Sequence, residues 1–188
     1  GHSVGDWEID GVIEGDIGMS TVAVAWPVGE SGAFSVKYGQ SDEKGIEVLG
    51  DTFDDIGLEL DDLTLTYSTE DYFVGYQALD VDFAGNAGRI EGDFTGFFLG
   101  GSGANDSGFY YSAAVALVNA EFEDLDLETD ISIGLSIGLG FAQSLTDNLV
   151  WSADYKYQNY WLDWDVEVEG EEDNMVLSSF GLTLKYSQ

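Results

Sequence analysis

Residues 130–151, DISIGLSIGLGFAQSLTDNLVW, decide the fold of this chain, because no charge lies between Asp130 and Asp147 in a protein of formal net charge −32. A large apolar residue occupies every second position from 131 to 141, and serine, glycine or alanine fills the positions between. A period of two residues is typical of a β-strand and not of a helix. The stretch therefore predicts a strand with one wholly apolar face and one face of very small side chains.

The two faces of this strand indicate what surrounds it. A half-buried strand of a soluble protein would carry charged or long polar residues on its second face. About ten steps of roughly 3.3 Å, tilted by about 40°, give an apolar band about 25 Å tall, which is the height of the lipid-facing band of an outer-membrane barrel. We expect hydrocarbon against the apolar face and a crowded interior against the small face.

The same alternation recurs elsewhere in the chain. Apolar stripes start at Phe34, Ile90 and Val176 and continue at every second position, and we expect each stripe to face lipid. Clusters rich in Gly, Asp, Ser and Asn separate the segments, among them SDEKG at 41–45, and a switch of phase at Asp61 and Asp62 predicts a β-bulge or a membrane boundary. The expected strands are 4–14, 17–28, 33–40, 45–67, 72–83, 88–99, 109–122, 130–144, 148–166 and 174–187.

The fold class predicted from this pattern is all-β. An even number of strands suits a closed antiparallel up-and-down transmembrane β-barrel with both termini on one side. Ten strands are expected, and eight strands after an N-terminal extension are the alternative. Gly1-His2-Ser3 resembles the remnant of a purification tag, so residues 4–188 are expected to form a single domain.

The composition limits the classes of partner. The 37 acidic residues against 5 basic ones repel phosphates, so no nucleic acid partner is expected, and divalent cations or small solutes are the natural ligands. The absence of cysteine excludes disulfides and thiolate metal sites. No run of about 18 apolar residues is present, so a transmembrane helix is not expected.

The few basic residues are predicted to lie inside the barrel. Most of them occupy the face opposite the apolar stripe of their strand, and charges in such an interior persist only when they are paired. This network would either fill and rigidify a narrow lumen or line a polar conduit. Its predicted members are Lys37, Arg89, Glu91, Asp93, Asp154, Lys156 and Lys185.

Acidic clusters on the loop side are candidate cation sites. Several carboxylates there could hold Ca²⁺ or Mg²⁺, although the spacing of an EF-hand loop is absent, and solvated loops are the alternative. The candidates are Glu121, Glu123, Asp124, Asp126, Glu128, Glu171, Glu172 and Asp173. The single histidine, His2, leaves no Ser-His, Cys-His or His-metal constellation, so we expect neither an enzyme nor a cofactor.

Tyrosine and tryptophan gather near the ends of the expected strands, where girdles at the two membrane interfaces would place them. The rival interpretation is a platform that stacks carbohydrate. The residues concerned are Trp7, Trp26, Tyr67, Tyr72, Tyr110, Tyr111, Trp151, Tyr160, Trp161 and Trp164.

Three segments resemble small Gram-negative outer-membrane β-barrels of the OmpA, OmpX and OmpW type. Residues 140–149, GFAQSLTDNL, followed by WSADYKY, are similar to a periplasmic hairpin of that superfamily. The C-terminal FGLTLKYSQ resembles the closing strand, and GYQALDVD at 75–82 resembles a Gly-Tyr-x-x-Leu-Asp segment that many members carry. The resemblance implies an outer-membrane location, with the bilayer and lipopolysaccharide as surroundings, and we expect a monomer.

Three functions fit these observations. The first is a narrow passive pore or small-solute conduit whose cation preference comes from the acidic loops. The second is a plugged barrel that serves envelope structure or adhesion through those loops. The third is a soluble acidic β-barrel or sandwich that binds a ligand and whose apolar stripes form its core.

Overall fold

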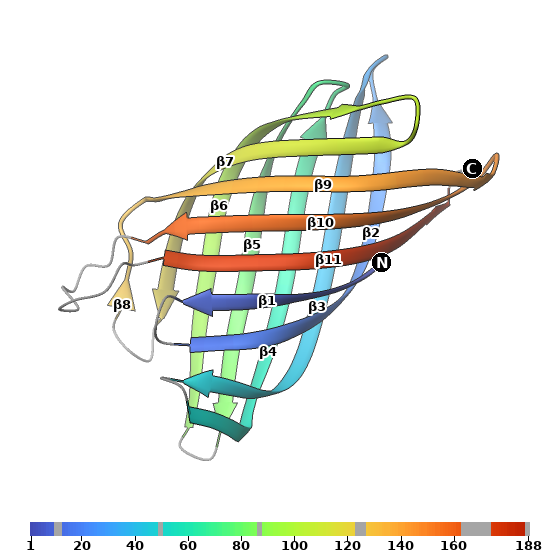
Figure 1. The fold of residues 1–188 in the computed structure, drawn as a ribbon. Coiled ribbons are helices and arrows are strands. Elements are labelled where there is room, and N and C mark those ends of the chain that lie inside the picture. The colour runs from blue at the N-terminus through green and yellow to red at the C-terminus, as the bar shows by residue number, and fades with distance from the viewer. Residues whose placement is uncertain (10–12, 49–50, 86–87, 123–126, 163–173, 187–188) are drawn as a thin grey trace.

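A computed structural model describes residues 1–9, 13–48, 51–85, 88–122, 127–162 and 174–186, and every regular element in these ranges is a β-strand (Figure 1). Long strands of alternating sequence form the wall, and one short strand, β8, pairs with the end of β7. Their bounds are β1 His2–Ile9, β2 Ile13–Val28, β3 Gly32–Val48, β4 Asp51–Ser68, β5 Tyr72–Gly85, β6 Gly88–Ala104, β7 Phe109–Phe122, β8 Leu127–Glu128, β9 Ser132–Thr146, β10 Leu149–Trp161 and β11 Asn174–Tyr186.

The wall is a closed antiparallel barrel. Strands β1 to β6 pair in chain order, β7, β9, β10 and β11 continue the order, and β8 pairs only with the end of β7. The pairings β6–β7 and β1–β11 join the two runs into a ring. The predicted barrel of ten strands is confirmed, and the alternative of eight strands is wrong.

The two ends of the barrel differ. Short turns join β2 to β3, β4 to β5, β6 to β7 and β9 to β10 at one end, which we call the turn end. Gly29 and Gly108 adopt φ values of 69° and 87° in two of these turns, a conformation that suits glycine. Both chain termini point toward this end in Figure 1. We call the opposite end the loop end.

Three predicted boundaries need correction. SDEKG at 41–45 is not a turn, because β3 continues through it and pairs Ser41 with Leu60 and Lys44 with Gly57. The β-bulge predicted at Asp61 and Asp62 is wrong, because the register there is continuous and the irregularity of β4 lies between Phe53 and Gly57. The alternative for this change of phase, a membrane boundary, stays a prediction. His2 and Ser3 belong to β1 and pair with β2 and β11. Their origin in a tag stays a prediction.

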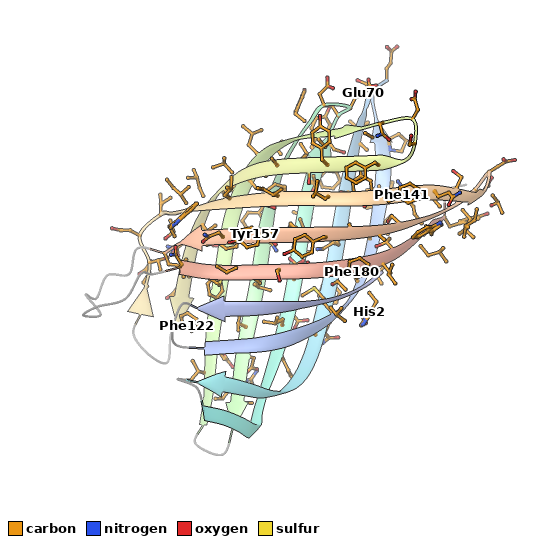
Figure 2. All side chains as sticks on the ribbon, in the orientation of Figure 1. His2, Glu70, Phe122, Phe141, Tyr157 and Phe180 are labelled. Atoms are coloured by element: carbon orange, nitrogen blue, oxygen red, sulfur yellow. The ribbon has the colours of Figure 1, made fainter. Side chains whose placement is uncertain are left out.

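The faces of β9 and β11 agree with the prediction. Ile131 and Ile133 are 73% and 53% exposed on the outside, while Ser132 and Gly134, which alternate with them, are buried. Phe180, Leu182, Leu184 and Tyr186 are exposed along β11 in the same way. Figure 2 labels Phe141 and Phe180 on this outer wall. These apolar stripes therefore lie outside the barrel and not in a core.

Strand β6 has the opposite orientation to the predicted one. Phe94 is 5% exposed inside the barrel, and Phe97 and Leu99 are 66% and 62% exposed on the outside. The predicted lipid-facing stripe from Ile90 to Phe98 thus lines the lumen. Lumenal Phe94 packs edge-on against Phe122 of β7, with ring centroids 5.7 Å apart.

Glycines on the lumenal face make room for large rings. A Cβ on Gly134 would lie 2.4 Å from the ring of Tyr160, and a Cβ on Gly92 would lie 2.4 Å from the ring of Phe122. Such distances are far below van der Waals contact, so only glycine lets these rings lie against the neighbouring strand. This packing explains why the inner face of β9 is so small.

Candidate functional site in the barrel lumen

An apolar layer fills the lumen toward the loop end. Its buried side chains come from β4 to β7 and, across the barrel, from β10, from Leu162 just after β10 and from β11, and Met19 of β2 packs against them. Because opposite walls contribute to one packed cluster, the layer spans the lumen. Its members are Leu60, Val81, Phe94, Val118, Ala120, Phe122, Tyr160, Leu162 and Met175.

A polar layer centred on Asp62 lies next to the apolar layer. The side chain of Asp62 is only 4% exposed, and Lys37 Nζ lies 2.8 Å from its Oδ2. Thr64 Oγ1 and Gln77 Nε2 donate hydrogen bonds to its Oδ1 at 3.1 Å and 2.9 Å. A buried carboxylate with one ammonium and two neutral donors is fully satisfied and rigid. Lys37 therefore faces the lumen.

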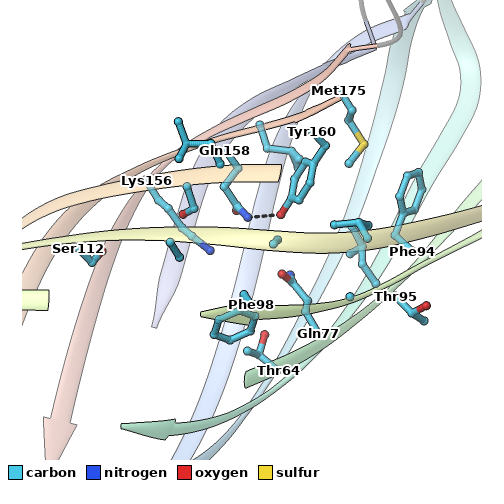
Figure 3. A pocket seen from close by; sticks show the side chains of 18 of the residues that line it. Thr64, Gln77, Phe94, Thr95, Phe98, Ser112, Lys156, Gln158, Tyr160 and Met175 are labelled. Carbon is cyan, nitrogen blue, oxygen red and sulfur yellow. Dashed lines mark hydrogen bonds between the residues drawn. The ribbon is translucent and has the colours of Figure 1, made fainter. Parts of the chain in front are cut away.

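A cavity of about 150 Å³ is lined by residues of both layers. Lys156 and Gln158 extend into it from β10, and Thr64 and Gln77 extend into it from β4 and β5 (Figure 3). Its remaining surface is largely apolar and includes Leu79, Phe94, Phe98, Met175 and Leu177. The cavity therefore offers a polar part and an apolar part side by side.

Lys156 reaches into this cavity as predicted. The ion pairs within 4.0 Å among the described residues are Lys37 with Asp62 and Arg89 with Asp82 and Glu91. No carboxylate in that part of the chain therefore lies within 4.0 Å of the Lys156 ammonium. Gln158, two residues further on β10, donates its amide hydrogen to the hydroxyl of Tyr160 and not to a charged group.

Two further predicted lumenal residues lie on the inner faces of their strands. Asp154 of β10 receives a long hydrogen bond of 3.5 Å from the hydroxyl of Tyr110, and it lies against Gly181 of β11. Lys185 lies on the lumenal side of β11, where it pairs with Val150 in register, but it is exposed near the turn end.

The prediction that Arg89, Glu91 and Asp93 face the lumen is wrong. All three lie on the outer face of β6, and the side chains of Arg89 and Glu91 are each 61% exposed. Arg89 pairs there with Asp82 of β5 and with Glu91, whose oxygen lies 3.0 Å from Arg89 Nε. The inner positions between them carry Ile90, Gly92 and Phe94, which pack into the lumen. Charges can face outward here because this part of β6 lies beyond the apolar outer wall.

A row of carboxylates crosses the outer wall at the level of Asp93. Asp61, Asp80, Asp93 and Glu121 are direct cross-strand neighbours on β4, β5, β6 and β7. The hydroxyl of Tyr38 donates a hydrogen bond of 2.5 Å to Asp61 at one end of the row. We call these four side chains the carboxylate row. Toward the turn end, the outer faces of the same strands are apolar.

The loop-side cation candidates are only partly described. Glu121 and Glu128 are exposed and pair in register between β7 and β8. Within the described part of the chain, no group of His, Cys, Asp and Glu side chains is arranged to hold a metal ion. The remaining candidates lie outside the described residues: Glu123, Asp124, Asp126, Glu171, Glu172 and Asp173.

The aromatic residues divide between the two faces. Trp26, Tyr67, Tyr72, Tyr111 and Trp161 are exposed on the outside, as girdles require. Tyr110 and Tyr160 instead face the lumen, where Gly140 and Gly134 make room for their rings. Trp164 lies outside the described residues.

Sequence reasoning missed the residue at the centre of the polar layer. Asp62 was interpreted only as part of a change of phase, although it shares a face with Thr64 and with the buried Leu60. The pairing of β3 with β4 would have identified Asp62. Lys37 pairs in register with Thr64, and Asp62 is the next residue on the same face of β4. Gln77 and Gln158 give no comparable signal, because glutamine is common on exposed faces.

Likeness to known proteins is confined to solved structures. No protein-family model and no curated protein matches the chain. The chain is similar to OmpT of Vibrio cholerae (16% identity, TM-score 0.40), covering 98% of this chain and 64% of that one. It is also similar to the translocator domain of the autotransporter NalP from Neisseria meningitidis (15%, TM-score 0.48), with coverage of 100% and 85%.

A third similar structure is the outer-membrane protein OprG from Pseudomonas aeruginosa, with 15% identity, a TM-score of 0.35 and coverage of 99% and 97%. The chain spans less than two thirds of the length of OmpT. Among the described residues, no helix is long and apolar enough to cross a membrane. The pairing of its ten long strands gives the chain the closed, antiparallel, even-stranded architecture of the outer-membrane barrels that its motifs resemble.

Proposed function

We propose that the protein is an outer-membrane β-barrel whose lumen is blocked by a packed apolar layer, and that it acts as a structural or adhesion barrel of the envelope and not as an open pore. The apolar layer carries this proposal. Its members are 0% to 8% exposed, and they pack across the lumen from opposite walls. Ions and water cannot pass packed apolar side chains without opening them.

The outer wall supports the membrane location. Large apolar side chains are exposed on neighbouring strands, including Val115 and Leu117 on β7 and Ile133 and Leu135 on β9. A soluble protein rarely exposes so extended an apolar surface, whereas hydrocarbon stabilises it. In a soluble sandwich or lipocalin-like binding protein, these apolar stripes would have to face inward and form the core.

A narrow pore with cation preference is the second candidate, and it stays a prediction. The described lumen holds the carboxylates of Asp62 and Asp154 and the ammonium groups of Lys37, Lys156 and Lys185, so it carries no excess of negative charge. A preference for cations would therefore have to come from acidic groups outside the lumen. Surroundings of lipopolysaccharide, a monomeric state and the absence of catalysis are likewise predictions.

Two experiments test the proposal. Detergent-refolded protein should run differently on a denaturing gel before and after boiling, because a closed barrel resists detergent until it is heated. The same protein should insert into a planar bilayer without discrete conductance steps. Stable steps from the unaltered protein would overturn the closed state, and their reversal potential in a salt gradient would then measure ion preference.

A series of variants tests whether the apolar layer is what prevents conductance. Replacing Phe94 and Phe122 together by alanine removes the edge-on pair and should produce conductance steps. The matched control is Phe97→Ala, which removes the same side chain from the outer face of β6. If the double variant still shifts on the gel after boiling but gives no conductance steps, the apolar layer is not what closes the barrel.

A further inference from the structure

We propose that the lumenal cavity binds a small monoanion with an unbranched apolar body, a carboxylate of medium chain length, with Lys156 as its charge partner. The inference goes beyond the closed barrel, because the cavity and its lining do not depend on whether the lumen conducts. It rests on three properties of the cavity: an ammonium with no carboxylate of the described residues within 4.0 Å, neutral donors beside it and an apolar remainder.

The ammonium of Lys156 supplies the charge. Asp62 is already satisfied by Lys37, Thr64 and Gln77, so it is not free to move toward Lys156. Asp154 lies against Gly181 of β11. An ammonium inside a largely apolar enclosure is costly unless an anion accompanies it. A carboxylate that enters the cavity would form the charge-assisted hydrogen bond that the described residues do not provide.

The lining sets the shape and polarity of the ligand. Ser112 and Gln77 line the same cavity as Lys156. The Ser112 hydroxyl, and the amide hydrogen of Gln77 that is not given to Asp62, can serve a second carboxylate oxygen. Leu79, Phe98 and Leu177 line its apolar part and can cover a hydrocarbon chain (Figure 3). Since one water needs about 10–15 Å³ of such space, the cavity has room for about ten water-sized groups. A ligand of six to ten non-hydrogen atoms, on the order of hexanoate, fits that volume.

A phosphate or a dianion fits less well. A second negative charge would lie among apolar side chains without a second unpaired cation, because Lys37 is held by Asp62. A neutral alcohol of the same length would fill the apolar part but would leave Lys156 without a partner. The structure therefore favours a single negative charge at one end of an apolar body.

The test is calorimetric titration of hexanoate into the folded, detergent-solubilised protein, with 1-hexanol as the uncharged probe. Hexanoate should bind, and Lys156→Gln should weaken it at least about tenfold, because the variant keeps the size of the side chain and loses the charge. Lys156→Arg should retain binding. Lys185→Gln is the matched control, since it removes a lysine from the lumenal side of β11 outside the cavity, and it should leave the affinity unchanged.

Three results would overturn the site: no binding of hexanoate, equal binding by Lys156→Gln, or equal affinity for 1-hexanol. If Lys156→Gln fails the heat-shift check of folding, the unaltered protein still decides the question. Hexanoate should then protect Lys156, but not Lys185, from an amine-reactive reagent, as read by mass spectrometry of the two peptides. A barrel that shifts on heating and inserts silently, but neither binds hexanoate nor gains protection, refutes this site and leaves the closed barrel standing.

Discussion

The outer faces of β9 and β6 differ in where their apolar stretch ends. On β9 the outward side chains are apolar at every position from 131 to 141. On β6 they are apolar at Phe97 and Leu99 and charged at Arg89, Glu91 and Asp93. The comparison shows that alternation identifies a strand but does not by itself say which face points outward. The outward face can be apolar along one part of a strand and charged along another. A charged position can therefore be an outward one.

The largest expected effect is on chemical access from water. The chain has no cysteine, so single cysteines can report each position. In lipid vesicles, Asp93→Cys should react with a water-soluble maleimide, and Phe97→Cys and Leu135→Cys should not, because hydrocarbon covers the last two. Full reaction after solubilisation and unfolding is the control. Equal labelling at 93 and 97 would show that the boundary between water and hydrocarbon does not lie between these two positions of β6.

The next effect is on stability. Leu135→Arg places a charge within the apolar stripe of β9 and should lower the free energy of unfolding in vesicles by about 2–4 kcal/mol. Glu91→Arg is the matched control on β6, where the side chain is already charged and exposed, and it should change stability little. Denaturant titration measures both. Similar losses for the two variants would mean that both walls lie in the same surroundings.

The lumenal sides of the two walls should behave alike, in contrast to their outer sides. Gly134→Ala on β9 and Gly92→Ala on β6 each push a Cβ into an aromatic ring, and each should cost about 1–3 kcal/mol. Gly101→Ala on the outside of β6, whose nearest atom would lie at 3.3 Å, should cost less. The same unfolding assay checks this. A cost for Gly101→Ala as large as that for Gly92→Ala would argue against ring packing as the cause.

The smallest effect concerns the carboxylate row. Asp80 has Asp61 and Asp93 directly opposite it on both neighbouring strands. Like charges in such positions repel, so Asp80→Asn should raise the free energy of unfolding by about 0.2–1 kcal/mol at low salt. High salt should reduce the gain, because it screens exposed charges. A gain that salt does not change would place the row away from water.

The sequence predicts β9 well because its two faces are unambiguous. Long apolar residues cannot share the inner face with Tyr160 and Ala116, so only one orientation satisfies both sides. Strand β6 carries phenylalanine on both faces, at 94, 97 and 98, and the pattern there does not select an orientation. The turn predicted at 41–45 is wrong because β3 continues past the apolar outer wall, where polar residues and glycine no longer mark the end of a strand.

The candidate site was predictable only in part. Lys37 and Lys156 follow from the face that they share with small residues, and both line the cavity. Asp62 and Gln77 could not be joined to them, because their meeting depends on the register between β3, β4 and β5. Register depends on pairing across the barrel, which no single strand encodes.

The seam between β1 and β11 has a consequence for how the chain reaches its native state. It pairs eight residues of β1 with β11, so the two ends of the sequence close the ring. Contacts between such distant segments form slowly, because a long loop must first be brought together. Until that happens, β1 and β11 each present an unpaired edge, which is a template for pairing with another chain. The waiting time before closure, more than the stability of the finished barrel, therefore sets the exposure of this protein to aggregation.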